Sequence, residues 1–217
     1  SAPLVAATGD MDVDAFADAN TVDAGIGIGV GVAINIDGQW IQSAVGGTVT
    51  APSIFLQTLQ SGDMLNSFNV RAVSGAGAED IGVAGAFAVN LSGDPRELVS
   101  DPYKILEPTG GGQHNALITD GAILNLDAGN DVTINSTYQG SYDATATALP
   151  GVGTVGIGPS VALNAINHTT RSEIGDVFIT NADNIVVTAD GTYTTNTRSI
   201  AGANNNGSLP AAIALTA

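Results

Sequence analysis

Short segments in which apolar and polar residues alternate with a period of two make up most of the chain. This alternation is typical of β-strands that bury one face, whereas an amphipathic helix repeats its apolar residues every three or four positions. It is most regular at residues 10–15, 53–57, 131–135 and 184–188. Glycine-containing turn signals, such as Asp37-Gly38 and Asp120-Gly121, separate many of the segments. The pattern therefore predicts an all-β protein with almost no helix.

A second pattern is a ribbon of glycine and alanine alternating with larger apolar residues, and it ends in asparagine. It occurs at residues 27–35, 82–90 and 156–164, and begins again at 212–216. A third, weaker apolar pattern lies between the others, at 44–49, 116–124 and 173–179. Three patterns that recur in one order predict a repeat protein with units of about 50 to 75 residues.

The small residues of the ribbons indicate how the strands pack. Glycine and alanine facing inward would let two sheets approach more closely than the ~10 Å of an ordinary sandwich. Equivalent strands would then stack in parallel, which predicts a parallel β-solenoid (β-helix). The terminal asparagines Asn35, Asn90 and Asn164 would form a structural amide ladder. A β-sandwich is the alternative architecture. We expect a single domain over 1–217, with an insertion at about 91–115 that forms a loop or short helix.

Composition narrows the classes of partner. The 217 residues include 21 Asp or Glu but only 5 Lys or Arg, and the formal net charge is −16. Such a chain would be repelled by the phosphates of a nucleic acid. It has no cysteine, which excludes a disulfide-stapled module. We find no run of 18 apolar residues, so we predict no membrane-spanning segment.

An acidic cluster near the start of the chain is a candidate cation site. Asp10, Asp12 and Asp14 alternate and would share one face of a strand. Carboxylates suit Ca²⁺, but the sequence has neither an EF-hand loop nor a calcium-binding glycine-rich nonapeptide. The alternative is a solvated acidic face that serves solubility. We expect no cofactor other than this candidate calcium.

The sequence gives little indication of catalysis. The chain has no Gly-x-Ser-x-Gly motif and no thiol, and its basic residues are widely spread, so we predict a protein that is not an enzyme. One segment combines charges of both signs with an aromatic residue, and we interpret it as a candidate contact site, with a tolerated loop insertion as the alternative. Its residues are Arg96, Glu97, Tyr103, Lys104, Glu107 and His114. His168 is expected at the surface, in a Thr-rich turn.

The repeats resemble the β-strand-repeat regions of giant bacterial filamentous surface adhesins of the leukotoxin type. The resemblance rests on Val32–Asn35, Phe87–Asn90 and Val161–Asn164, and on the Thr-rich and alternating segments 167–171 and 184–189. It covers most of the chain outside 91–115.

The resemblance implies a secreted structural or adhesive protein at the bacterial cell surface, in a fibre or matrix filament. Its expected partners are further copies of itself, joined head to tail or laterally, and surface glycans or other cells. A carbohydrate-binding or carbohydrate-active β-helix protein is the alternative function, and its mark would be a groove lined by Arg, Lys and carboxylates. Whether the chain is one link of a longer protein or a self-assembling subunit stays open.

Overall fold

The computed structural model describes residues 4–8, 12–59, 65–92, 112–150, 155–202 and 209–216. These residues form twelve β-strands and no helix, and every strand pairing among them is parallel. The strands are β1 (Leu4–Thr8), β2 (Asp12–Asp37), β3 (Trp40–Val45), β4 (Thr48–Ala51), β5 (Ile54–Leu59), β6 (Asn66–Ser92), β7 (Gly112–Ile118), β8 (Ile123–Pro150), β9 (Val155–Ile166), β10 (His168–Ile174), β11 (Phe178–Ala201) and β12 (Leu209–Thr216). The predicted all-β class with parallel sheets is confirmed.

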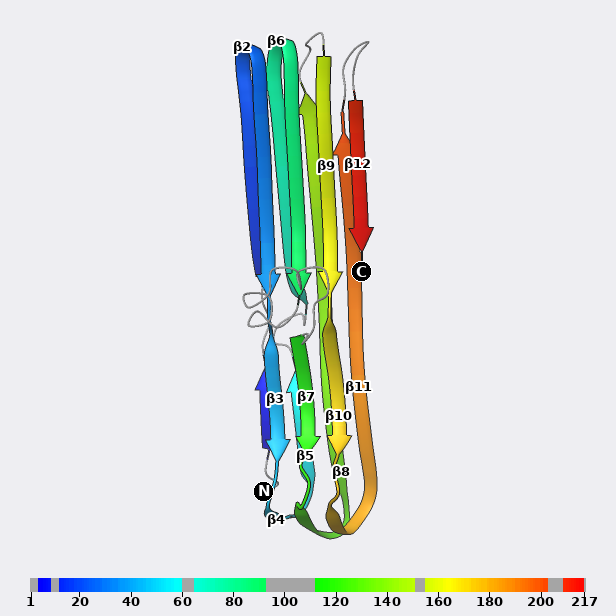
Figure 1. Ribbon diagram of the computed structural model, residues 1–217. Helices are drawn as coiled ribbons and strands as arrows, with labels where there is room; N and C mark the ends of the chain where they lie inside the picture. Colours follow the sequence, from blue (N-terminus) through cyan, green and yellow to red (C-terminus); the bar gives the residue numbers. More distant parts are fainter. Residues whose placement is uncertain are drawn as a thin grey trace.

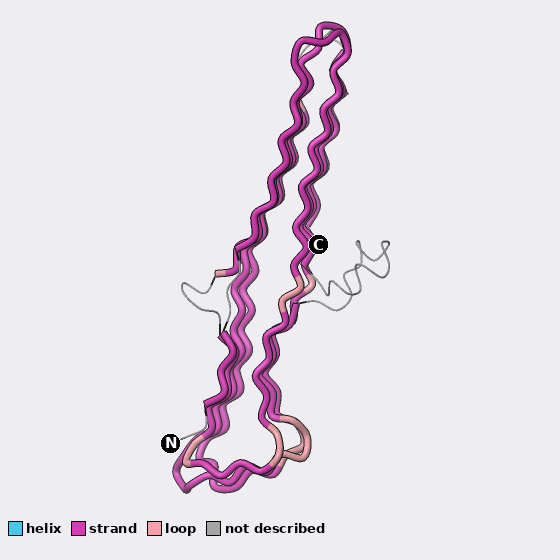
Figure 2. Tube along the Cα trace, turned by 90° about the vertical axis from the view of Figure 1, so that its left-hand side faces the viewer, coloured by secondary structure: helices cyan, strands magenta, loops and turns pink. Residues whose placement is uncertain are grey.

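The chain repeatedly runs up one leg and down another, so that the molecule is long and flat (Figures 1 and 2). The first leg contains β5, residues 66–76 of β6, most of β8 and β11. The second leg contains residues 26–37 of β2, residues 81–92 of β6, β9 and β12, continued downward by β3, β7 and β10. One strand order, β1-β5-β8-β6-β9-β12, links nine strands with β2, β4 and β11, while β10-β7-β3 forms a second sheet.

We call one passage up the first leg and down the second a circuit. Each circuit pairs with the next one, and the sequence offset between paired residues is similar for all circuits except the one that contains the longer segment after β6. Asn35 pairs with Asn90, and Val132 pairs with Ile185, at offsets of 55 and 53 residues. The offset between β6 and β8 is 74 residues, because the longer segment after β6 lies within that circuit. The ribbons therefore lie side by side in register, as the repeat predicts.

One equivalence inferred from the alternation is wrong. The segment 10–15 was grouped with 53–57, but Asp12 pairs with Ser67, whereas Phe55 pairs with Leu4 and Thr133. Alternation records only that a strand has a buried and an exposed face. It does not record the height of the strand along the leg, which depends on pairing between distant segments.

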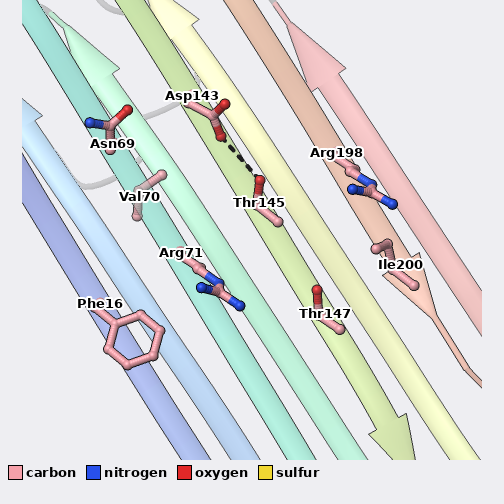
Figure 3. A pocket seen from close by; sticks show the side chains of 9 residues that line it. All are labelled: Phe16, Asn69, Val70, Arg71, Asp143, Thr145, Thr147, Arg198 and Ile200. Atoms are coloured by element: carbon pink, nitrogen blue, oxygen red, sulfur yellow. Dashed lines mark hydrogen bonds between the residues drawn. The ribbon is translucent and has the colours of Figure 1, made fainter.

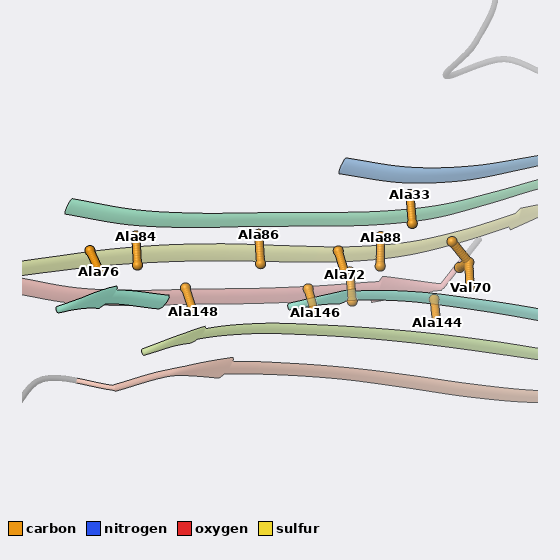
Figure 4. Close-up of a cluster of buried hydrophobic side chains, with 11 residues drawn as sticks. Ala33, Val70, Ala72, Ala76, Ala84, Ala86, Ala88, Ala144, Ala146 and Ala148 are labelled. Carbon is orange, nitrogen blue, oxygen red and sulfur yellow. The ribbon is translucent and has the colours of Figure 1, made fainter. Parts of the chain in front are cut away.

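The interior is narrow where it is built from alanine. In the upper half, the side chains between the legs are mostly alanines with almost no exposed surface (Figure 4), and the cluster consists of Ala33, Val70, Ala72, Ala76, Ala84, Ala86, Ala88, Ala144, Ala146, Ala148 and Ala162. A Cβ on Gly31 would lie 2.5 Å from the carbonyl oxygen of Val73. The hydroxyl of Ser74 donates a hydrogen bond of 2.5 Å to the carbonyl of Gly29 across the same gap. The lower half is wider and is filled by larger residues, including Leu56, Leu124 and Ile134.

Some turn signals mark bends and others lie inside strands. Gly47 and Gly121 have positive φ angles of 72° and 75°, and they lie in the connections from β3 to β4 and from β7 to β8. Two other glycine-containing turn signals, Gly75-Ala76-Gly77 and Asp190-Gly191, do not mark turns, because they lie within β6 and β11. The margins of the expected insertion are likewise strand, because β6 extends to Ser92 and β7 begins at Gly112. Residues 93–111 lie outside the described residues.

Candidate functional site

The outer face of the first leg carries a surface groove. Its volume is about 630 Å³. The lining combines an aromatic ring, two arginines, one carboxylate and several polar groups (Figure 3), and consists of Phe16, Asn69, Val70, Arg71, Asp143, Thr145, Thr147, Arg198 and Ile200. We refer to this set as the groove.

The groove is assembled by the register of four adjacent strands. Phe16 pairs with Arg71, Arg71 pairs with Thr145, and Thr145 pairs with Arg198. The two arginines therefore lie on either side of Thr145 in one row across the sheet. Two strand spacings separate them, which is about 10 Å between backbones.

The charges of the groove differ from those of the whole chain. The Arg71 guanidinium lies 5.6 Å from the centre of the Phe16 ring, within range of a cation–π contact. The hydroxyl of Thr145 donates to Asp143 Oδ1 at 3.0 Å, and the amide of Asn196 donates to Asp143 Oδ2 at 2.6 Å. The charged groups of the described lining are thus two guanidinium groups and one carboxylate, in a strongly acidic protein.

This arrangement is suited to binding an oxyanion. Guanidinium groups form paired hydrogen bonds with carboxylates, and an aromatic ring beside them offers an apolar surface. The described lining residues include one carboxylate, Asp143, and two guanidinium groups, so they offer the chemistry of anion binding in this groove. Sequence reasoning missed it, although Arg71 and Arg198 lie two repeat offsets apart, and that spacing could have indicated a shared row.

The structure places the three ribbon asparagines at one level. Asn35 pairs with Asn90, and Asn90 pairs with Asn164. All three side chains are buried. The Asn90 amide donates to Asn164 Oδ1 at 2.9 Å, which links two successive circuits directly.

The same amides also join the two legs. Asn35 Nδ2 donates to the carbonyl of Asn69 at 2.8 Å, Asn90 Nδ2 to that of Asp143 at 2.8 Å, and Asn164 Nδ2 to that of Asn196 at 3.0 Å. Each acceptor lies on the first leg, opposite the asparagine. Buried amides with several partners stabilise one particular arrangement of the strands around them.

An aromatic cluster, in which His114 and Tyr138 are buried, lies where the wide lower half meets the narrow upper half. It consists of His114, Tyr138, His168 and Tyr193. The ring of Tyr138 stacks on His168 with 3.6 Å between centroids and meets His114 edge-on at 4.8 Å. The glycine at position 112 leaves room for this stack, because a Cβ there would lie 2.3 Å from His168 Nδ1.

Both histidines differ from what the sequence predicts. His114 was placed in the candidate contact site, but its side chain is fully buried and cannot meet a partner at the surface. His168 was expected in an exposed turn, but it begins strand β10 and both its ring nitrogens are buried. Burial lowers the pKa of His114 to about 4 and that of His168 to about 3, because the charged imidazolium would lose its hydration.

A chain of polar groups leads from this cluster to a buried carboxyl group. The hydroxyls of Tyr138 and Tyr142 lie 2.6 Å apart, Tyr142 donates to Ser92 at 3.4 Å, and Ser92 donates to Asp37 Oδ2 at 3.2 Å. Burial raises the pKa of Asp37 to about 6 and that of Tyr142 to about 12. The residues of this chain are far apart in the sequence and follow no motif, so sequence reasoning did not find them.

The other candidate residues have no described side chains. Arg96, Glu97, Tyr103, Lys104, Glu107 and Asp10 lie outside the described residues. Asp12 and Asp14 lie in β2 and pair with Ser67 and Asn69. Within the described ranges, no three His, Asp or Glu side chains come together as a metal site requires. No helix in the described part of the chain has the length and hydrophobicity to cross a membrane.

No family model, curated protein or solved structure matched this chain in comparisons with known proteins.

Proposed function

We propose that this chain is a non-enzymatic structural unit of an extracellular fibre or matrix filament at a bacterial surface, built as a parallel β-solenoid. The observation that carries the proposal is the parallel, in-register pairing of each circuit with the next, over strands of up to 28 residues. Parallel stacking gives continuous backbone hydrogen bonding along one axis, which suits a stiff scaffold.

The outer edges of the sheet support the same reading. Among the described residues, β2 pairs only with β6 at one edge, and β11 pairs only with β8 at the other. Long strands with an unpaired edge readily pair with further strands, since their backbone donors and acceptors on that side need partners. We infer that more sheet of the same kind continues at these edges, supplied by another copy or by more of one chain.

This proposal sets the dimensions of a fibre. Four circuits at about 4.8 Å each would advance about 19 Å along the axis. The legs would lie across the axis, which gives a flat ribbon whose width is the length of a leg. Negative-stain electron microscopy and fibre diffraction of the purified chain would show such ribbons and a meridional spacing near 4.8 Å.

The same preparation also tests the candidate calcium. Loss of the ribbons in a calcium chelator, and their return with added Ca²⁺, would place the cation at the contacts between units. Ribbons that persist in the chelator would remove calcium from the proposal. Dispersed particles that form no ribbon and show no 4.8 Å spacing, with or without Ca²⁺, would contradict self-assembly of this chain.

The groove favours a second candidate function, the binding of an acidic glycan. Arg71 and Arg198 lie in one row about two strand spacings apart, beside the exposed ring of Phe16. A chain of uronic acid sugars could present two carboxylates to this row while one sugar face packs on the ring. Such binding would give the fibre an adhesive role.

Titration calorimetry with an oligogalacturonate tests this second function. The expected result is binding that weakens with salt and that the double substitution Arg71→Ala/Arg198→Ala abolishes. Arg171→Ala is the matched control, because Arg171 already forms an ion pair with Glu173 away from the groove. Equal affinity for a neutral oligosaccharide, or unchanged binding by the double variant, would contradict it.

A further inference from the structure

The second leg presents an outer face made of large apolar side chains. Along residues 26–36 of β2, glycine, alanine and asparagine alternate inward, while isoleucine and valine point outward. Ile26 is 64% exposed, and Ile34 and Ile36 are 51% and 55% exposed. The usual arrangement, with bulky apolar residues inside and small ones outside, is reversed here.

Three neighbouring strands extend this face. Val32 pairs with Phe87, Phe87 with Val161, and Val161 with Ile213, so that one row of apolar side chains crosses four circuits. We call the whole surface the apolar face. Its described side chains include no charged or polar residue, and they are Ile26, Ile28, Val30, Val32, Ile34, Ile36, Ile81, Val83, Phe87, Val89, Val155, Ile157, Pro159, Val161, Leu163, Ala211, Ile213 and Leu215.

The apolar face is as large as the largest apolar patches of monomeric proteins. Ten residue steps of about 3.3 Å and four strands of about 4.8 Å give roughly 600 Å². The largest contiguous apolar patch on a monomeric protein measures about 300 to 600 Å², and a patch of that size is often an interaction site. The opposite face of the same part of the molecule carries the polar groove, with Arg71, Asp143 and Arg198. The upper half is therefore amphipathic across its thickness.

We propose that a second copy of this chain covers the apolar face, with the two faces packed against each other around a two-fold axis. Both faces are built from rows of isoleucine and valine on parallel strands, so the ridges of one copy match the grooves of the other. The interface would bury roughly 1,200 Å² in total, the lower end of the range for specific protein interfaces. This pairing is independent of any joining of units at the sheet edges.

The charge of the chain favours a second copy over a lipid surface as the occupant. A protein of net charge −16 is repelled by anionic membranes, and the apolar face has no Lys or Arg among its described residues to contact lipid headgroups. Two acidic copies also repel each other, but the contact surfaces themselves are uncharged. Salt screens that repulsion, so the pairing should strengthen as ionic strength rises.

Analytical ultracentrifugation of the whole chain tests the proposal. The expected result is a dimer that tightens with salt. Phe87→Lys, which places a charge at the middle of the face, should weaken the dimer by at least about a hundredfold. Ser141→Lys is the matched control, since it makes the same charge change on the opposite face and should leave the dimer unchanged.

The wild-type chain by itself can overturn the proposal. A monomer at high concentration and high salt would contradict it, as would cosedimentation of the monomer with phosphatidylcholine vesicles. A dimer that Phe87→Lys leaves intact, with circular dichroism showing a folded variant, would contradict it as well.

If ribbons form through the sheet edges, face pairing should double their thickness, and Phe87→Lys should return single ribbons. A variant that forms only single ribbons has thus lost the face pairing, whereas a variant that forms no ribbons has lost the pairing at the sheet edges.

Discussion

Replacing Gly31 by alanine tests how closely the two legs are packed. The new Cβ would lie 2.5 Å from the carbonyl oxygen of Val73, and its neighbours there are backbone atoms that no rotamer change can move. An ordinary contact begins at 3.4 Å, so the legs would have to separate by about 0.9 Å. Adjacent alanines such as Ala72 and Ala86 are fully buried, so this movement would open their contacts as well. Overpacking of this kind costs about 1–3 kcal/mol.

Gly85 provides the matched control in the neighbouring strand. A Cβ there would lie 3.7 Å from Val30 Cγ2, which is an ordinary contact. We expect Gly85→Ala to be neutral or to raise the free energy of unfolding by up to about 1 kcal/mol, because alanine restricts the unfolded chain. Urea unfolding followed by circular dichroism, at one protein concentration, compares the two variants. If Gly31→Ala is as stable as Gly85→Ala, the legs are not in contact at this level and the account of the narrow interior is wrong.

The remaining predictions concern the buried polar groups. The pKa is lowered from 6.5 to about 4 for His114 and to about 3 for His168, because both imidazoles are buried in their neutral form. Their contribution to the stability of the folded state is therefore complete above pH 6.5 and is lost as the pH falls from 6.5 towards 4. For His114 the loss is about 3 kcal/mol, and comparison of the wild type with His114→Asn separates it from the opposite contribution of Asp37: between pH 7 and pH 4 the urea midpoint of the wild type should fall relative to that of the variant. Asp37, whose pKa is raised from 3.8 to about 6, acts in the opposite sense, because its contribution to stability is lost as the pH rises through 6. Asp37→Asn should therefore gain about 3 kcal/mol at pH 7. Asn90→Ala removes three hydrogen bonds of a buried amide and should lower the free energy of unfolding by about 1–3 kcal/mol, measured by thermal or urea unfolding. The control Asn184→Ala, at the exposed surface, should lower it by less than about 0.5 kcal/mol. Equal effects of the two substitutions would argue against a stabilising role for the asparagine ladder.

The sequence by itself determined the β class and much of the strand pairing. Alternation at period two fixes which residues share a face, and the recurring ribbons ending in Asn35, Asn90 and Asn164 fix which segments are equivalent. Identical patterns do not slip by one residue, because such a shift would place large outward side chains in the narrow interior. The closeness of the legs follows from the glycines and alanines of the ribbons for the same reason.

Only the tertiary structure decided where the chemistry lies. The groove brings together Phe16, Arg71 and Arg198, and the aromatic cluster brings together His114 and His168. These residues are neighbours because the strands of successive circuits pair at particular sequence offsets. One offset is longer than the others because of the segment after β6, so the partners could not be read from a single period. Alternation distinguishes two faces of a strand but not inside from outside. The small size of the ribbon alanines predicts that they face inward, and the structure confirms this with isoleucine outside, because backbones that approach this closely leave no space between them for a larger side chain.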